Sequence, residues 1–155
     1  MNHSLRTAII GMGVISHYYV AAFEQVEECD LVAVCDLDPA KLDAHRAAGR
    51  RCTADYRELL AAPGIDAVVV NLPNSLHAQV CREALEAGKH LCCEKPLTLD
   101  LQEASALQSL AMQRRLTLLT AFHRRYNHHV IEAKLRDAFK DAVSITAHYD
   151  ERIED

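Results

Sequence analysis

The residues best suited to chemistry in this chain stand where short apolar runs end. Gly11 and Gly13 follow the first such run, and Asp36 follows the second, 20 residues after Ser16. Glycines at such a turn let the backbone approach a bulky anion, and the N–H groups at the start of the next helix attract it. A carboxylate at the end of the next strand can accept hydrogen bonds from both hydroxyls of a ribose. The spacing therefore predicts a site for a dinucleotide.

The same residues bear on which dinucleotide binds. The carboxylate of Asp36 would repel a 2′-phosphate, which favours NAD over NADP. Ser16 takes the place of the third glycine of the full fingerprint and still allows fairly close packing. Two other interpretations stay open: Asp36 could cap a turn with Asp38, and sheets of this kind also bind S-adenosylmethionine.

Two further polar segments follow apolar runs later in the chain. Residues 71–77 (Asn-Leu-Pro-Asn-Ser-Leu-His) come after one run, and residues 94–96 (Glu-Lys-Pro) come after the next. Open α/β sheets bind ligands at the carboxyl ends of their strands, so these segments would lie beside the glycine turn. The proline holds Lys95 in an extended backbone and places its ammonium near the expected nicotinamide. From the residues alone, Lys95 could equally be a surface charge.

The elements that must position these residues alternate along the chain. The predicted strands cover residues 7–10, 31–35, a short stretch near 52, 67–70, 90–93 and 117–120. The predicted helices cover residues 16–26, 39–48, about 56–61, 75–87 and 100 to about 114. Asp38 is expected to cap one helix, and Asp100 with Glu103 resembles a capping box. The alternation predicts an α/β fold with a doubly wound parallel sheet, the Rossmann fold.

Composition excludes several classes of partner. The chain has 155 residues, with 22 acidic and 17 basic side chains and a net charge of -5. A nucleic-acid or anionic-membrane surface requires a basic excess, and no apolar run approaches the roughly 20 residues of a membrane span. We therefore expect no nucleic acid and no membrane among the partners. The N-terminus has no signal-peptide pattern, which favours the cytoplasm.

The cysteines and histidines do not predict a metal site. The six cysteines include no C-x-x-C pair and several stand in apolar runs, so we expect structural thiols. The nine histidines are scattered, and His128 and His129 are neighbours rather than one helical turn apart. A zinc site would need converging ligands, so no metal is expected.

Taken together, residues 71–77 and 94–96 resemble the glucose-fructose oxidoreductase and inositol dehydrogenase family, called Gfo/Idh/MocA. The resemblance runs from Thr7 to about Asp150, and residues 121–127 are similar to that family's crossing into its second domain. It implies that Lys95 is the catalytic lysine that hydrogen-bonds the substrate oxygen, and that the Lys95–Pro96 bond is cis. With the glycine motif, it implies these cofactor-binding residues: Gly11, Gly13, Val14, Ile15, Asp36, Asn71, Pro73, Asn74, His77, Glu94 and Lys95. His123 and Arg124, at the end of the last strand, are candidates for contact with substrate, and they could equally be ordinary polar residues that follow a strand. His77 could instead be a solvent-facing residue at the start of a helix.

The resemblance also implies a function and a domain division. Residues 1–123 would be the dinucleotide-binding Rossmann domain. Residues 124–155 would begin a truncated α+β second domain for substrate and oligomerisation, with a helix at 128–139 and a strand at 142–148. Family members are about twice as long, and their second domain carries the substrate pocket and an acid/base histidine. We expect a homo-oligomeric parent oxidoreductase that moves a hydride between NAD and a polyol or sugar-like alcohol. The chain alone would be inactive, and the alternative is a dinucleotide-sensing module without catalysis.

Overall fold

The computed structural model describes residues 4–135. The chain divides into two compact units, Met1–Ala121 and Phe122–Asp155, and each is described by itself. The first unit contains the predicted sheet. The second contains a 3-10 turn, η2 (His123–Tyr126), and helix α6 (His128–Leu135). The predicted strand at 142–148 and the end of the predicted helix at 128–139 lie outside the described residues.

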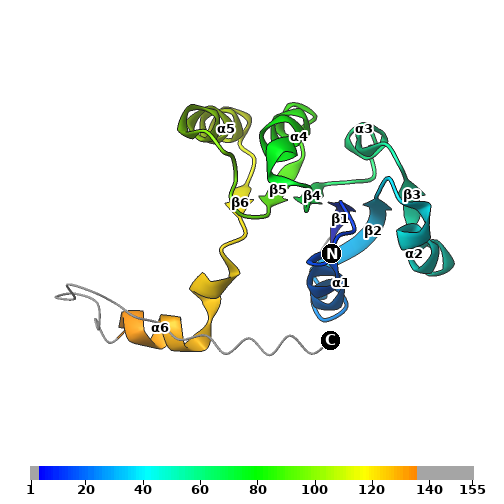
Figure 1. Ribbon diagram of the computed structural model, residues 1–155, viewed down its shortest axis with the longest axis horizontal. Helices are drawn as coiled ribbons and strands as arrows, with labels where there is room; N and C mark the ends of the chain where they lie inside the picture. The colour runs from blue at the N-terminus through cyan, green and yellow to red at the C-terminus, as the bar shows by residue number, and fades with distance from the viewer. Residues whose placement is uncertain (1–3, 136–155) are drawn as a thin grey trace. The chain divides into compact units, whose positions relative to one another are not determined.

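Six parallel strands form the sheet of the first unit, in the order β3-β2-β1-β4-β5-β6 (Figure 1). The strands are β1 (Leu5–Ile10), β2 (Cys29–Cys35), β3 (Arg51–Thr53), β4 (Ala67–Val70), β5 (His90–Cys93) and β6 (Leu118–Thr120). After β3 the chain crosses to the other side of β1, so β4 pairs with β1 although 56 residues lie between Ile10 and Ala67. The doubly wound parallel sheet is confirmed, and its switch point lies between β1 and β4.

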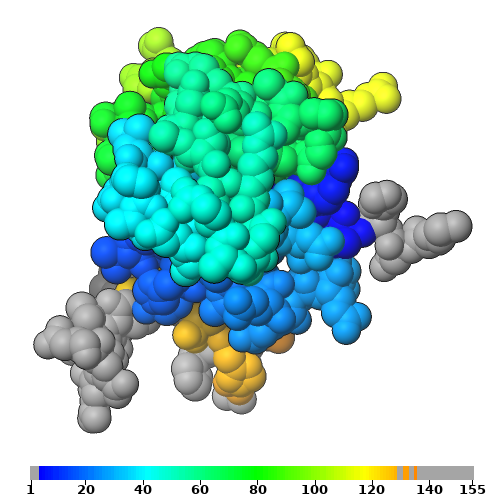
Figure 2. Space-filling model, turned by 90° about the vertical axis from the view of Figure 1, so that its right-hand side faces the viewer, coloured from blue at the N-terminus to red at the C-terminus, as the bar shows by residue number. Residues whose placement is uncertain are grey.

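Helices cover both faces of this sheet. They are α1 (Ser16–Phe23), η1 (Pro39–Leu42), α2 (Asp43–Ala47), α3 (Tyr56–Leu60), α4 (Asn74–Glu86) and α5 (Leu101–Arg114). Figure 1 shows α1 and α2 on one face and α3, α4 and α5 on the other. Figure 2 views the unit from the β3 edge, where α2 and α3, in cyan to blue-green, form much of the surface.

The sheet is apolar on both faces because both are covered. All four residues of β4 are buried, the continuous pattern of a central parallel strand. One face packs Leu85 of α4 and Leu107 of α5 against Val68 and Val70. The other packs Val69 with Ile9 and Val34. Burying a side chain such as Leu85 or Leu107 contributes about 1.5–3 kcal/mol of stability.

Three predicted helices have boundaries that differ from those in the structure. The first helix ends at Phe23 rather than Val26, because acidic residues follow it and are unfavourable at the negative end of a helix. The predicted helix at 39–48 starts as a 3-10 turn, in which the N–H of Lys41 donates to the oxygen of Asp38. Helix α4 begins one residue early, at Asn74. Both predicted caps are confirmed: Asp38 accepts from the N–H of Ala40, and Asp100 accepts from those of Gln102 and Glu103.

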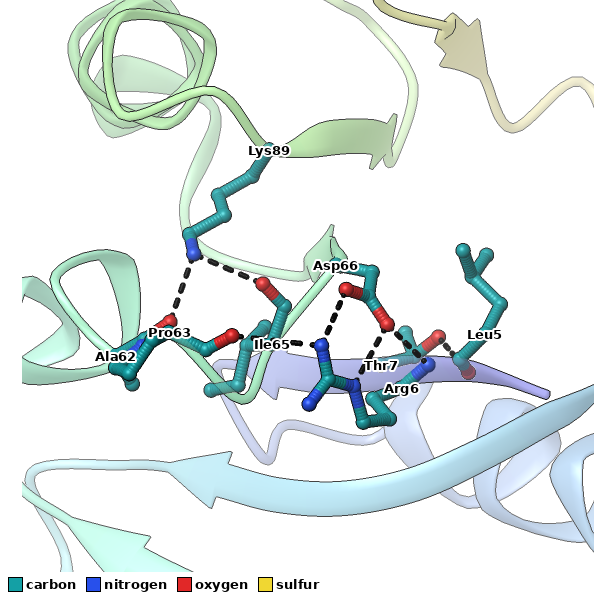
Figure 3. Close-up of polar contacts among 8 residues, drawn as sticks. All are labelled: Leu5, Arg6, Thr7, Ala62, Pro63, Ile65, Asp66 and Lys89. Atoms are coloured by element: carbon teal, nitrogen blue, oxygen red, sulfur yellow. Dashed lines mark hydrogen bonds and ion pairs between the residues drawn. The ribbon is translucent and has the colours of Figure 1, made fainter. Parts of the chain in front are cut away.

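The amino-terminal edge of the sheet is held by two polar contacts (Figure 3). Arg6 donates from Nε and Nη2 to the two carboxylate oxygens of Asp66, at 2.9 and 2.7 Å. Lys89 is buried, and its Nζ donates to the backbone oxygens of Ala62 and Ile65, both at 2.8 Å. Burial lowers the pKa of Lys89. These contacts connect the starts of β1, β4 and β5 at the edge opposite the predicted site.

Candidate functional site

The glycine turn after β1 is shaped by a neighbouring strand end. Gly11 has a φ of +95°, and a Cβ placed there would lie 2.5 Å from the backbone oxygen of Asn71. Its N–H donates to the oxygen of Cys35, and the N–H of Asn71 donates to that of Ile10. Only glycine fits this close crossing of three strand ends. The turn therefore places the start of α1 directly beside the exits of β2 and β4.

The second glycine faces open space instead. A Cβ at Gly13 would meet no atom of the described part of the chain within 4 Å. Within residues 4–135, the N–H groups of Gly13, Val14 and Ile15 find no acceptor in the chain, and Val14 is 84% exposed. Ser16, buried behind them, donates its hydroxyl to the oxygen of Gly13 at 2.6 Å and holds the turn. Free N–H groups over an open helix start are the arrangement that binds a phosphate.

Asp36 lies at the end of β2, as predicted, and its carboxylate is already ordered. Its two oxygens accept from the N–H of Met12, at 2.7 Å, and from that of Asp38, at 2.9 Å. The ammonium of Lys41 lies 3.4 Å from the nearer oxygen, and the Asp36 side chain is 12% exposed. Burial alone would raise the pKa of Asp36, but the N–H donors of Asp38 and Met12 and the Lys41 charge lower it. Asp36 is therefore an ionised acceptor at the edge of the glycine turn.

Asn71 carries a buried amide without a partner. Neither its Nδ2 nor its Oδ1 has a hydrogen-bond partner among the described residues. Buried amides are almost always hydrogen-bonded, so the amide of Asn71 leaves a donor and an acceptor for a ligand or a water molecule. Pro73 and Asn74 follow in exposed positions at the start of α4. This segment offers polar groups on the β4 side of the glycine turn.

Glu94 is held by a residue of α1, which lies on the face of the sheet opposite to α4. It is 8% exposed, and its Oε1 accepts from the hydroxyl of Tyr19 in α1 at 2.9 Å. Its Oε2 accepts from the N–H of Lys95 at 3.2 Å. Burial, with Cys92 and Glu94 close by, raises the pKa of Tyr19, which therefore stays a hydrogen-bond donor. Glu94 thus connects α1 to the segment that carries Lys95.

Lys95 is exposed and lies at the end of β5. Among the described residues its ammonium has no carboxylate within ion-pair distance, so it is available to a ligand. The bond to Pro96 is cis, as the resemblance implies. His77, in contrast, is wholly buried, and both of its ring nitrogens face backbone oxygens.

The two predicted substrate residues belong to the second unit. His123 and Arg124 are exposed within η2. Lys95 and the glycine turn belong to the first unit.

Sequence reasoning missed three residues that shape the site. Met12 supplies an N–H to Asp36, Lys41 supplies its nearest cation, and Tyr19 supplies a donor to Glu94. Tyr19 could have been found, since it stands three residues after the buried Ser16 and shares its helix face. Lys41 could have been noticed as the first base after Asp36.

Two cysteines of the sheet, Cys35 and Cys92, have raised pKa values, which favours the thiol form. Burial, and then the nearby acids beginning with Asp36, raise the pKa of Cys35 to about 11. Burial also raises the pKa of Cys92. Among residues 4–135 no three His, Cys, Asp or Glu side chains gather as a metal site would require. In the same range no helix is long and apolar enough to cross a membrane.

The model of an oxidoreductase family with an NAD-binding Rossmann fold matches residues 5–122. A scyllo-inositol 2-dehydrogenase (NAD(+)) of Bacillus subtilis is 33% identical over 141 residues, which are 88% of this chain and 41% of that enzyme.

Two solved structures share the fold closely. The apo scyllo-inositol dehydrogenase from Lactobacillus casei has a TM-score of 0.81 at 27% identity, covering 90% of this chain and 43% of that one. A 3-ketoreductase from Actinomadura kijaniata in complex with NADP and TDP-benzene has a TM-score of 0.79 at 30% identity, covering 88% and 43%. The chain spans about two fifths of the length of these relatives.

Proposed function

The chain belongs to the Gfo/Idh/MocA oxidoreductase family, and on that premise we propose that its NAD(P)-binding domain serves a dehydrogenase of polyols or sugar-like alcohols. The domain would comprise residues 1–123, and residues 124–155 would begin the substrate domain. The change of compact unit between Ala121 and Phe122 supports this division. His123 and Arg124 would then meet the substrate as the second domain begins.

One observation carries the cofactor site: at a single edge of the sheet, the unpartnered N–H groups of the glycine turn and the unpartnered amide of Asn71 gather with the ordered carboxylates of Asp36 and Glu94. The open N–H groups at Gly13 would bind the pyrophosphate, and Asp36 would accept from the adenosine ribose. The unpartnered amide of Asn71 and the exposed Pro73 and Asn74 would line the nicotinamide end. Glu94 would face the nicotinamide ribose. The residues present therefore fit a dinucleotide.

Lys95 would carry the chain's part in the chemistry. Its exposed ammonium would donate a hydrogen bond to the substrate oxygen and stabilise negative charge there. Glu94 holds the N–H of Lys95 and so limits where that ammonium can reach. A bound nicotinamide would supply the hydride acceptor or donor.

We further propose that NAD binds more tightly than NADP. The ionised, partly buried Asp36 would face a 2′-phosphate as a like charge. Lys41 opposes this effect, because it sits 3.4 Å from the same carboxylate and could attract the phosphate. Relatives bind either form: one is named for NAD(+), and another was solved with NADP.

A glycine pair tests the cofactor site without disturbing the fold. In Gly13→Ala the new methyl meets no protein atom, so stability should persist while it blocks the approach of the pyrophosphate. NAD affinity measured by calorimetry should fall at least about tenfold, or 1.4 kcal/mol. Gly64→Ala is the matched control, since its methyl would meet only Arg6, at 3.7 Å, at the opposite sheet edge. Equal NAD affinity in the two variants, or no binding by the unchanged chain, would refute the site.

A further inference from the structure

His77 joins the two polar segments that meet at the proposed cofactor site. It stands in the first turn of α4 with 0% of its surface exposed. Its Nδ1 lies 2.7 Å from the backbone oxygen of Pro96, and its Nε2 lies 2.8 Å from that of Leu72. Leu72 is adjacent to Asn71, and Pro96 is adjacent to Lys95. One imidazole therefore spans the exits of β4 and β5.

The two contacts determine how many hydrogens the ring carries. A backbone oxygen only accepts, so each ring nitrogen must donate to make both bonds. A neutral imidazole carries one N–H, and its other nitrogen would then turn a lone pair toward an oxygen less than 3 Å away. Full burial excludes solvent as a substitute donor. Burial and the positive end of α4 both disfavour a positive charge on the imidazole. The two short hydrogen bonds to backbone oxygens must therefore offset that unfavourable free energy.

We propose that His77 is an imidazolium that positions Lys95 and Asn71 by fixing their neighbours' backbone oxygens. It is a positioning residue, since both nitrogens are used within the chain and its surface is closed to a ligand. Tyr19 fixes the same segment from the other face of the sheet through Glu94. The positioning part of this proposal rests on the proposed cofactor site, whereas the protonation state does not.

Nitrogen-15 spectroscopy of the unmodified chain reads the protonation state directly. At neutral pH both ring nitrogens of His77 should show the shift and the directly bonded hydrogen of an imidazolium. His90 is the internal control, because its Nδ1 accepts from the N–H of Thr117 at 3.0 Å and so must carry no hydrogen. A His77 nitrogen with the shift of an unprotonated imidazole would overturn the proposal. This result is independent of whether the chain binds NAD.

The positioning role is tested by adding NAD to the same sample. If His77 holds the two segments that NAD contacts, binding should slow exchange of both its ring hydrogens with solvent by at least about tenfold. The ring of His90, at the other sheet edge, should be unaffected. In His77→Leu, NAD affinity should fall about tenfold through lost preorganisation, while His77→Gln, which keeps one donor, should recover part of it. Unchanged hydrogen exchange on NAD binding would contradict the positioning role even if neither variant folds. An unchanged chain that fails to bind NAD would refute the proposed function instead.

Discussion

At the scale of single residues, the two glycines of the turn are needed for different reasons. The fold requires glycine at position 11, whereas a bound ligand would require glycine at position 13. Gly11 has a positive φ and a backbone oxygen where its side chain would be. Gly13 has neither constraint, yet it lies over the open start of α1. The sequence alone does not distinguish these two glycines. Their surroundings in the structure show that Gly11 is needed for folding, and they leave ligand binding as the reason for Gly13.

Gly11→Ala should therefore lower stability even without any cofactor. The added carbon would sit 2.5 Å from the oxygen of Asn71 in a backbone conformation that disfavours side chains. Strain and overpacking together should cost about 2–4 kcal/mol of the free energy of unfolding. Urea unfolding of the chain without cofactor measures this cost. A loss below about 0.5 kcal/mol would show that the crossing of β1 and β4 is looser than described.

Asp36 and Lys41 should shift cofactor preference in opposite directions. Asp36→Asn removes the charge that repels a 2′-phosphate. The difference in binding free energy between NAD and NADP should therefore narrow by about 1–2 kcal/mol. Lys41→Ala removes the nearby cation, so NADP should weaken more than NAD. Calorimetric titration of both cofactors into both variants measures these differences. Equal affinities for NAD and NADP in the unchanged chain would contradict a discriminating role for Asp36.

At the scale of elements, polar contacts between helices and loops supplement the apolar core. Glu83 of α4 accepts from the hydroxyl of Tyr56 in α3 at 2.9 Å and pairs with Arg57 at 3.2 Å. At the amino-terminal edge, Lys89 provides hydrogen bonds for the turn that follows α3. Both contacts lie away from the proposed cofactor site, so they can be altered without touching it.

Glu83 should make stability depend on pH in the acid range. Burial would raise its pKa, but Gln79, Tyr56 and Arg57 lower it below the ordinary value. A depressed folded-state pKa contributes stability that is present above the unfolded value, about 4.3, and is lost as the pH falls through the folded value. With the side chain 28% exposed, the effect should be at most about 1 kcal/mol. In Glu83→Gln, unfolding measured from pH ~7 to ~3 should show a shallower loss of stability; an identical slope would contradict this contribution.

Lys89→Met should destabilise the first unit although it replaces a charge with an apolar side chain. The buried oxygens of Ala62 and Ile65 would lose their Nζ donor, which costs about 1–3 kcal/mol. Arg46→Met is the control, since Arg46 is more than half exposed and its one ion pair among residues 4–135 is with the exposed Asp43. In thermal unfolding, Lys89→Met should have a clearly lower melting temperature than Arg46→Met. Equal melting temperatures would mean that the Lys89 contacts contribute nothing net.

At the scale of the whole molecule, the described residues would supply only part of what an alcohol dehydrogenase needs: the proposed cofactor site and Lys95, the proposed catalytic lysine. Oxidising an alcohol also needs a group that removes its proton, which typically raises the rate by about 10²–10⁴-fold. It also needs surrounding residues that orient the reacting carbon, which can lower the barrier by several kcal/mol. The aligned part of this chain covers 41–43% of the relatives that it matches, so they are a little more than twice as long as this chain. The missing functions would come from the rest of such a protein.

We therefore expect the 155-residue chain to bind NAD without measurable turnover. Supplying NAD with a panel of inositols and sugars, and following the absorbance of the reduced cofactor, tests this expectation. Turnover that Lys95→Ala abolishes would show that these residues already contain a working site. NAD binding with no turnover in a longer natural protein would favour a sensing module.

The sequence by itself determined the features that depend on neighbours along the chain. Apolar runs ended by Gly11 or Asp36 predicted buried strands, and Asp38 and Asp100 predicted helix starts, because a cap bonds N–H groups only two or three residues away. Parallel strands then place their ends at one edge, which is why the position of Asp36 and the Lys95 segment could be predicted. Helix ends were less accurate, since fraying and 3-10 turns are decided by small differences in free energy.

Only the tertiary structure decided which side chains meet. Tyr19 and Glu94 are 75 residues apart, and His77 bridges Leu72 and Pro96 across two strand exits. The open space at Gly13 and the crowding at Gly11 likewise depend on how β4 lies against β1. Such contacts follow from strand order and register, which arise when distant segments bury their apolar faces together. Local pattern carries no signal for them, because each partner is chosen by the packing of the whole sheet.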